Sequence, residues 1–252
     1  VLVPSSSGSA PAFGATSSRM SGFAETNDFK RVLVLGSKKV GKTSLLSAIS
    51  SREFDDDYYK TKKIDKFWDI QRRLEFIDTP GLDDKILELM PLTDKPILNM
   101  EEDPEIQEIF MAGRKLGAIG GYMLVYAQED HVTKIMVEQL LSVVVQVPDS
   151  GKATKIWVVE NEGNIMRVKQ FDTKRLPKKG KRGTMEEICE KAQASFFRVN
   201  VKTNKKIEDL LDKIAEDLCS KKELNQLFPN TSSTVNSTAA RTGCEVPSCV
   251  VM

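Results

Sequence analysis

The stretch Arg31–Ile49, RVLVLGSKKVGKTSLLSAI, decides the fold of this chain. Its central residues 36–43, GSKKVGKT, match the pattern G-x-x-x-x-G-K-[ST] in full. An apolar run before them predicts a short buried strand, and the residues from Ser44 onward predict the start of a helix. Strand, glycine-rich loop and helix in this order form a phosphate-binding loop, because backbone N–H groups surround the anion at a helix N-terminus. The sequence therefore predicts phosphate binding.

Every residue of this loop is a candidate nucleotide-binding residue: Gly36, Ser37, Lys38, Lys39, Val40, Gly41, Lys42, Thr43 and Ser44. In this pattern the lysine, Lys42, reaches the outer phosphates and the Thr43 hydroxyl ligates Mg²⁺. The alternative interpretation is an ordinary glycine-rich turn with a solvated lysine.

Composition limits the class of protein. The chain has 252 residues, which suits one sizeable domain with tails or at most two small domains. Its net charge of +1 argues against a dedicated nucleic-acid binder, so we expect no nucleic-acid partner. Four cysteines show neither metal-ligand spacing nor a dense disulfide pattern, which favours a reducing, cytosolic setting.

Apolar periodicity predicts strands alternating with helices. The predicted strands are Arg31–Leu35, Ile64–Ile70, Leu74–Ile77, Gly121–Tyr126, Lys155–Val159 and Phe196–Val199. The predicted helices are Lys42–Ser51, Ile106–Leu116, Val132–Val145, Met185–Ala194 and Lys206–Cys219. This order indicates an α/β fold of the P-loop NTPase type, with about six strands in a mostly parallel sheet and about five flanking helices.

One edge of this sheet is expected to be antiparallel. The second and third predicted strands lie too close together in sequence for a crossover helix, so they should form a hairpin. Residues 1–27 and 221–252 are poor in apolar periodicity and rich in small or polar residues, and we expect both to be flexible tails around a domain at 28–220.

A second group of residues helps to choose among the classes of protein that carry a phosphate-binding loop. Phe54, Tyr58 and Thr61 follow Lys42 by 12, 16 and 19 positions. Residues 78–81, DTPG, end the third predicted strand with the element D-x-x-G. An aspartate at a strand end can hold Mg²⁺ through water, and the N–H of Gly81 can meet a γ-phosphate. The alternative for DTPG alone is a plain β-turn.

With this spacing the sequence resembles the Ras-like small GTPases over roughly Phe29–Leu218. Residues 161–164, NEGN, occupy the place of the family's N-K-x-D, and residues 200–202, NVK, occupy the place of S-A-K. The resemblance implies binding of GTP and GDP with Mg²⁺, and it implies four groups of site residues. They are catalytic Lys42, Thr61 and Gly81; metal-ligating Thr43, Thr61 and Asp78; base-binding Phe54, Asn161, Asn164, Asn200, Val201 and Lys202; and the switch residue Tyr58.

Three departures from the family pattern bear on mechanism. Leu82 stands where many members carry the glutamine that orients the attacking water, which predicts slow hydrolysis. Lys38 introduces a bulky side chain where an arginine finger enters the site in the family. Asn164 offers one carbonyl and one NH₂ where the family's aspartate accepts two hydrogen bonds from guanine, and Glu162 replaces the lysine over the base. The last departure weakens the expected preference for guanine.

The C-terminal residues 249–252, CVVM, fit the C-a-a-X pattern, and a final methionine suggests farnesylation of Cys249. One lipid holds a protein only marginally, so a second signal is expected, with palmitoylation of Cys244 or nearby basic residues as candidates. These features predict a lipid anchor on the cytosolic face of a membrane, with the plasma membrane favoured.

The combined prediction is a membrane-anchored signalling switch that hydrolyses GTP slowly. Its effectors, exchange factors and GTPase-activating proteins are not named by the sequence. Residues 55–61 and 82–103 are the expected switch segments. A first alternative is an inactive pseudo-GTPase that serves as a membrane-tethered scaffold; a second is a P-loop kinase, for which neither an acceptor site nor an arginine-bearing lid is evident.

Overall fold

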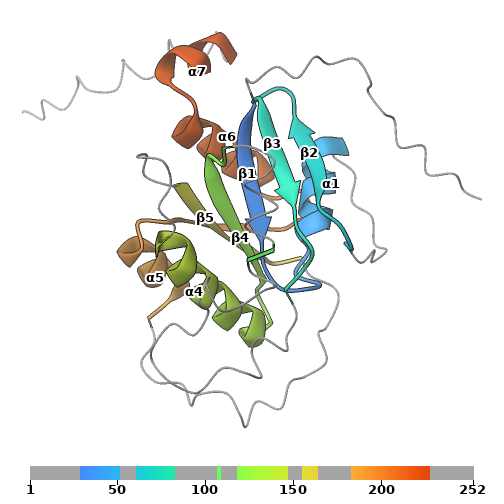
Figure 1. The fold of residues 1–252 in the computed structure, drawn as a ribbon, viewed down its shortest axis with the longest axis vertical. Coiled ribbons are helices and arrows are strands. Elements are labelled where there is room, and N and C mark those ends of the chain that lie inside the picture. Colours follow the sequence, from blue (N-terminus) through green and yellow to red (C-terminus); the bar gives the residue numbers. More distant parts are fainter. Residues whose placement is uncertain are drawn as a thin grey trace, which may run out of the picture.

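The computed structural model describes residues 29–51, 61–82, 107–108, 118–146, 155–163 and 183–227. The named elements in these ranges are six strands and five helices (Figure 1). The strands are β1 (Lys30–Leu35), β2 (Asp65–Asp69), β3 (Leu74–Asp78), β4 (Gly121–Ala127), β5 (Lys155–Asn161) and β6 (Ser195–Val199). The helices are α1 (Lys42–Ser51), α4 (His131–Gln146), α5 (Met185–Lys191), α6 (Ile207–Leu218) and α7 (Lys221–Leu227).

The six strands form one sheet in the order β2-β3-β1-β4-β5-β6. Only the β2–β3 pair is antiparallel, and the other four pairings are parallel. The predicted α/β fold with one antiparallel edge is therefore confirmed. The turn between β2 and β3 closes with the N–H of Arg73, in the left-handed region at φ 53°, which donates to the carbonyl of Ile70 at 3.4 Å.

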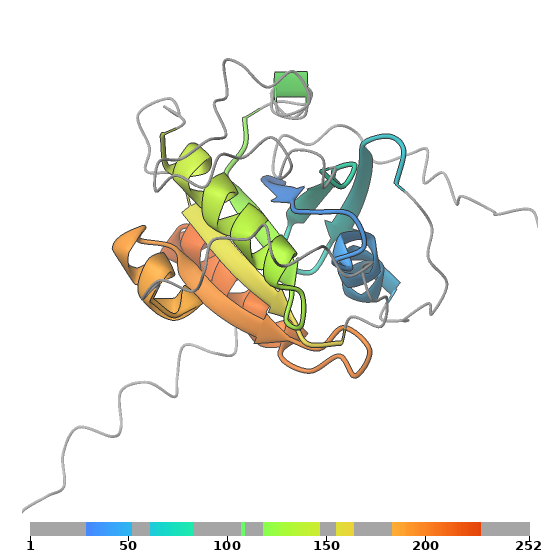
Figure 2. The same cartoon turned by 90° about the horizontal axis from the view of Figure 1, so that it is seen from below.

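The sheet buries an apolar layer on each face, and helices lie on both of its faces (Figure 2). Helices α4 and α5 cover one layer, and α1 and α6 cover the other. Strand β1 contributes side chains to both layers, because successive side chains of a strand point to opposite faces. Leu33 and Leu35 lie in the layer covered by α4, and Val32 and Val34 lie in the layer covered by α1. A strand buried on both faces is apolar along its length, which is the pattern that predicted it.

Two element boundaries differ from the predictions by more than one residue. Helix α5 ends at Lys191 rather than Ala194, because Gln193 adopts a left-handed conformation at φ 55° and turns the chain into β6. Strand β5 continues to Asn161, which places this residue at the strand's carboxyl end. Of the helix predicted at 106–116, only residues 107 and 108 are described, and both are helical.

Helix α7 corrects the expectation of a flexible tail from residue 221 onward. Ser220 and Glu223 form a capping box: the N–H of Glu223 donates to Ser220 Oγ at 3.3 Å, and the N–H of Ser220 donates to Glu223 Oε2 at 2.6 Å. Glu223 also pairs with Lys30 at 3.0 Å, which ties α7 to β1. The remaining domain boundaries stay predictions. In the part of the chain that is described, no helix has the length and hydrophobicity needed to cross a bilayer.

Candidate functional site

The phosphate loop joins β1 to α1, and two of its glycines adopt conformations that side chains rarely allow. Gly36 has φ 148° and Gly41 has φ 90°. A Cβ on Gly36 would lie 2.2 Å from the Val125 carbonyl oxygen, and one on Gly41 would lie 2.4 Å from Asn161 Nδ2. Close approach of β4 and β5 therefore requires glycine at both positions.

Lys42 lies beneath this loop and is almost completely buried, with 6% of its surface exposed. Its Nζ donates to the carbonyl oxygens of Gly36 and Ser37, both at 3.0 Å. An ammonium group has three N–H donors, so these two bonds fix the side chain and leave a third donor for an anion. Burial lowers the pKa of Lys42 to about 8, and the charge of Asp78 opposes that shift.

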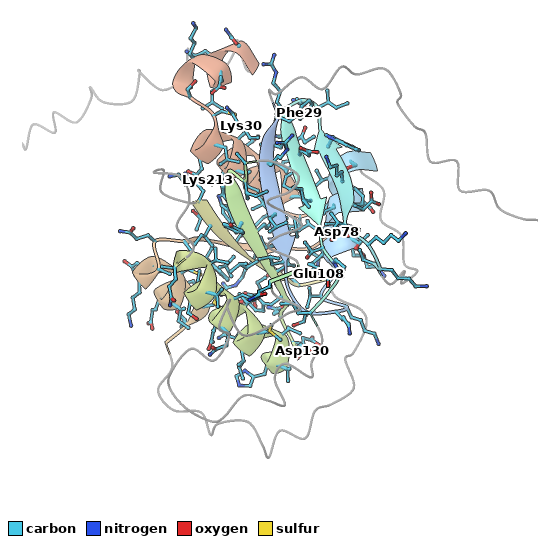
Figure 3. The ribbon with its side chains drawn as sticks, in the orientation of Figure 1. Phe29, Lys30, Asp78, Glu108, Asp130 and Lys213 are labelled. Carbon is cyan, nitrogen blue, oxygen red and sulfur yellow. The ribbon has the colours of Figure 1, made fainter. Side chains whose placement is uncertain are left out.

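Three oxygen-bearing side chains meet beside Lys42, each from a different element. The hydroxyl of Thr43, in the first turn of α1, donates to Asp78 Oδ2 at 2.6 Å. The hydroxyl oxygens of Thr43 and Thr61 lie 2.7 Å apart, and Thr61 Oγ1 donates to Asp78 Oδ2 at 3.4 Å. Asp78 is the last residue of β3 (Figure 3). The two threonines and the aspartate predicted as metal ligands therefore lie together.

The electrostatics of Asp78 suit a cation. Burial raises the pKa of its carboxyl, and the hydrogen bond from Thr43 and the charge of Lys42 partly offset this. Its Oδ1 atom is buried and has no hydrogen-bond partner among the described residues. A buried carboxylate oxygen without a partner is costly, whereas Mg²⁺ prefers oxygen ligands of this kind. The donor set therefore fits Mg²⁺, which Asp78 would hold together with the hydroxyls of Thr43 and Thr61.

The carboxyl end of β5 contacts the phosphate loop. Asn161 Nδ2 donates to the carbonyl of Val40 at 3.1 Å, and Asn161 Oδ1 accepts from the N–H of Gly163 at 3.1 Å. The N–H of Glu162 donates to the carbonyl of Val199 in β6 at 2.8 Å. Asn161 thus braces the phosphate loop against β5, and both of its side-chain polar atoms are used within the protein.

The loop after β6 lies against the same residues. A Cβ on Gly163 would lie 2.7 Å from Asn200 Oδ1 and 3.3 Å from the backbone nitrogen of Lys202. Asn200 Oδ1 accepts from the N–H of Thr203 at 3.1 Å, and the Asn200 backbone bridges Lys205 through two hydrogen bonds of 3.1 Å. The structure thus brings together the loops that occupy the places of N-K-x-D and S-A-K.

Further predicted site residues differ in burial, and some of them lie outside the described residues. Val40 and Val201 are buried in the apolar layer shared with α1 and α6, so only their backbone groups are available to a ligand. Ser44 lies half-buried in α1, and Lys39 is exposed in the left-handed region at φ 65°. Five predicted residues lie outside the described residues: Phe54, Tyr58, Asn164, Cys244 and Cys249.

Sequence reasoning missed one contact of the D-x-x-G element and one contact of Leu82, the residue after it. The hydroxyl of Thr79 is fully buried and donates to the carbonyl of Val34 at 2.7 Å. The sequence at Leu82 indicates only the absence of the water-orienting glutamine, whereas in the structure the Leu82 backbone bridges Ser37 of the phosphate loop. A threonine between the aspartate and the proline was a local signal for the first contact. No local signal indicates the second, because the two residues are brought together by the sheet.

This geometry defines a nucleotide-binding protein of the P-loop class. A family model described as 50S ribosome-binding GTPase matches residues 31–161, just over half of the 252-residue chain. The chain belongs to this GTPase family, whose members bind GTP and hydrolyse it, typically with Mg²⁺. A comparison with curated proteins finds no significant match.

Proposed function

We propose that the chain is a Ras-like GTPase that binds GTP and GDP with Mg²⁺, hydrolyses GTP slowly and acts as a membrane-anchored switch. The observation that carries the nucleotide part is the meeting of Thr43, Thr61 and Asp78 beside the buried ammonium of Lys42. Thr61 precedes β2 and Asp78 ends β3, so these contacts link the predicted switch segment 55–61 to the sheet, and the nucleotide state would order that segment.

Each group has a distinct task in the reaction GTP + H₂O → GDP + phosphate. Backbone N–H groups of the phosphate loop and the third donor of Lys42 bind the β- and γ-phosphates. The Gly81 N–H binds the γ-phosphate, and Thr43, Thr61 and Asp78 hold Mg²⁺. When bound, Mg²⁺ neutralises negative charge that develops on the phosphates. Water attacks the γ-phosphorus, and the bond to the β–γ bridging oxygen breaks.

Slow hydrolysis follows from the residue after the D-x-x-G element. Leu82 has no polar atom in its side chain and is 1% exposed, so it cannot orient water. The expected rate without a partner is therefore low, and a protein that supplies a polar group in trans would raise it.

Nucleotide binding tests this proposal first. We expect tight GDP binding that weakens when Mg²⁺ is chelated, measured by titrating nucleotide-free protein with fluorescent GDP, XDP and ADP. Preference for XDP or ADP would contradict the guanine assignment, which depends in part on Asn164 outside the described residues. Single-turnover phosphate release that Lys42→Ala abolishes would exclude the scaffold alternative. Lys191→Ala, at the exposed end of α5, is the matched control.

Membrane anchoring is a separate part of the proposal. It requires that Met252 is the last residue of the natural chain, because prenylation reads a terminal C-a-a-X pattern. We expect farnesyltransferase to modify the full chain and Cys249→Ser to abolish the modification. Loss of membrane association in cells should follow from the same substitution. Labelling that persists in Cys249→Ser would contradict this assignment.

A second candidate function comes from the description of the matching family, which names the 50S ribosomal subunit. Binding to large ribosomal subunits would make the GTPase a ribosome-associated factor rather than a membrane switch. Co-sedimentation with purified subunits in the presence of GDP or a non-hydrolysable GTP analogue separates the two. Nucleotide-dependent co-sedimentation supports the ribosomal function, and its absence favours the switch.

A further inference from the structure

The phosphate loop and the D-x-x-G element are joined by backbone hydrogen bonds beyond the ends of their strands. Strand β1 pairs with β3 as far as Val34 and Asp78. Farther along, Ser37 and Leu82 form a parallel bridge. The N–H of Leu82 donates to the carbonyl of Gly36, and the N–H of Lys38 donates to the carbonyl of Leu82, both at 3.2 Å.

The side chain of Leu82 anchors this bridge. It is 1% exposed and belongs to the apolar layer covered by α4, together with Leu35 and Ile77. Removing it from this layer would expose a whole leucine side chain to water, so burial opposes any movement of the segment away from the loop. A polar side chain at position 82 would have to leave the layer or lose its hydrogen bonds to water.

The buried side chain of Leu82 restrains the preceding residue, Gly81. A Cβ on Gly81 would lie 2.6 Å from Lys38 Cα and 2.7 Å from the Lys38 nitrogen, so the two backbones are in direct contact. On the other side, the Thr79 hydroxyl bonds to the carbonyl of Val34. Gly81 therefore lies against Lys38, and residues on either side of it in the chain, Thr79 and Leu82, are hydrogen-bonded to β1 and to the phosphate loop.

We propose that Leu82 is a positioning residue that holds the Gly81 N–H over the phosphate loop, and that it thereby sets the preference for nucleoside triphosphate over diphosphate. This inference rests on the proposed function, in which the Gly81 N–H binds the γ-phosphate. The diphosphate lacks that phosphate, so its affinity depends on the loop and Lys42 and not on the anchor. A preformed donor avoids the entropy loss of ordering a flexible segment when the ligand binds.

The test compares affinities for GDP and a non-hydrolysable GTP analogue in the full chain with Mg²⁺. Leu82→Ala should lower the analogue affinity about tenfold relative to GDP, because ordering a freed backbone residue opposes binding by roughly this factor. Leu140→Ala is the matched control, since Leu140 is a fully buried leucine of the same apolar layer on α4. It should lower the melting temperature to a similar extent and leave the affinity ratio unchanged.

The outcomes are distinct. Equal weakening of both nucleotides in Leu82→Ala, or the same change of ratio in Leu140→Ala, overturns the positioning role while the GTPase function stands. Failure of the unmodified chain to bind either nucleotide overturns the proposed function itself, and the inference with it. If Leu82→Ala does not fold, Leu82→Val carries the same test with a smaller change of ratio. Hydrogen exchange of the Leu82 amide, which should be slow in the unmodified chain and faster in the variant, reports the anchor without nucleotide.

Discussion

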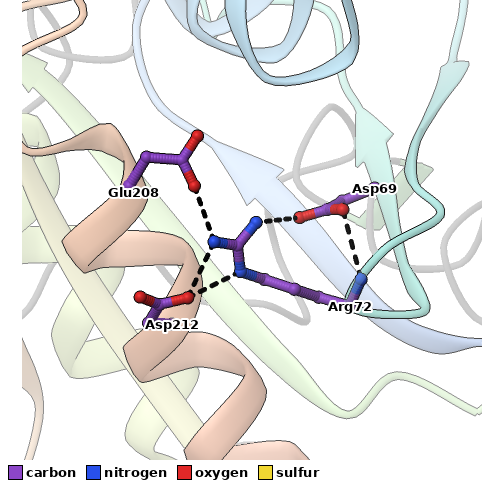
Figure 4. Close-up of polar contacts among 4 residues, drawn as sticks. All are labelled: Asp69, Arg72, Glu208 and Asp212. Atoms are coloured by element: carbon purple, nitrogen blue, oxygen red, sulfur yellow. Dashed lines mark hydrogen bonds and ion pairs between the residues drawn. The ribbon is translucent and has the colours of Figure 1, made fainter. Parts of the chain in front are cut away.

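Replacing Arg72 by methionine should destabilise the fold, because it leaves one buried carboxylate, that of Asp69, without its ion pair. Arg72 lies in the β2–β3 turn, and its guanidinium joins that turn to α6 (Figure 4). It donates to Asp69 at 2.9 Å, to Glu208 at 2.6 Å and to Asp212 at 2.8 Å. Burial by itself would lower the pKa of Arg72, but the hydrogen bonds to Asp212, Asp69 and Glu208 outweigh burial and raise it. The side chain therefore stays charged in the folded protein.

The expected magnitude follows from the exposure of the three partners. The side chains of Glu208 and Asp212 are 56% and 55% exposed, so water replaces the lost guanidinium. Asp69 is only 8% exposed and would keep one hydrogen bond, from the Arg72 N–H at 3.2 Å. Breaking a fully buried ion pair costs about 3–5 kcal/mol, and the exposure of two partners places the loss at about 3 kcal/mol. In a domain of this size that loss lowers the melting temperature by about 6–12 °C.

The assay is urea and thermal unfolding followed by circular dichroism. Arg73→Met, an exposed position in the same turn, is the control and should change stability by less than about 0.5 kcal/mol. Combining Arg72→Met with Asp69→Asn should restore part of the loss, because the buried charge is then absent. The reasoning is refuted if Arg72→Met costs no more than Arg73→Met, or if the double variant is no more stable than Arg72→Met alone.

Three further predictions follow from the site and the core. Asp78→Asn should reduce the Mg²⁺-dependent gain in GDP affinity at least about tenfold without unfolding the chain, because the amide oxygen still accepts from Thr43 while the charge is gone; unchanged Mg²⁺ dependence in titrations would contradict the metal-site assignment. Burial raises the pKa of Glu75, but hydrogen bonds from Lys66 and Arg31 outweigh it and hold the pKa below its ordinary 4.5. Its stabilising contribution is therefore complete above about pH 5 and is lost as the pH falls below the ordinary value. Melting temperatures should fall more steeply with acid in the unmodified chain than in Glu75→Gln, and parallel curves would count against this. Gly121→Ala should cost about 1–3 kcal/mol in chemical denaturation, because the new Cβ would lie 2.4 Å from the Trp157 ring and 2.7 Å from the backbone carbonyl oxygen of Lys155; a neutral result would contradict this tight packing of β4 against β5.

Local pattern predicted most of the fold. The strand, phosphate loop and helix around Lys42 were predicted from adjacent residues, since each depends on interactions within a few positions. The β2–β3 hairpin followed from a spacing too short for a crossover. Helix α7 was missed although its capping box, Ser220 with Glu223, is also a local signal. The end of α5 was missed because the left-handed conformation of Gln193 has no clear sequence signature.

The sequence by itself determined the phosphate loop and the order of strands and helices. The spacing of residues in the sequence also identified those proposed to surround Mg²⁺. Only the tertiary structure decided how these residues contact one another. Arg72 meets Glu208 and Asp212 across 136 and 140 positions, and Leu82 reaches the phosphate loop because β3 lies beside β1. Such partners are selected when sheet and helices pack together, and neither periodicity nor spacing encodes them. Leu82 illustrates this difference. The sequence shows only that a leucine replaces the water-orienting glutamine, whereas in the folded protein the leucine side chain is buried and its backbone bridges the phosphate loop.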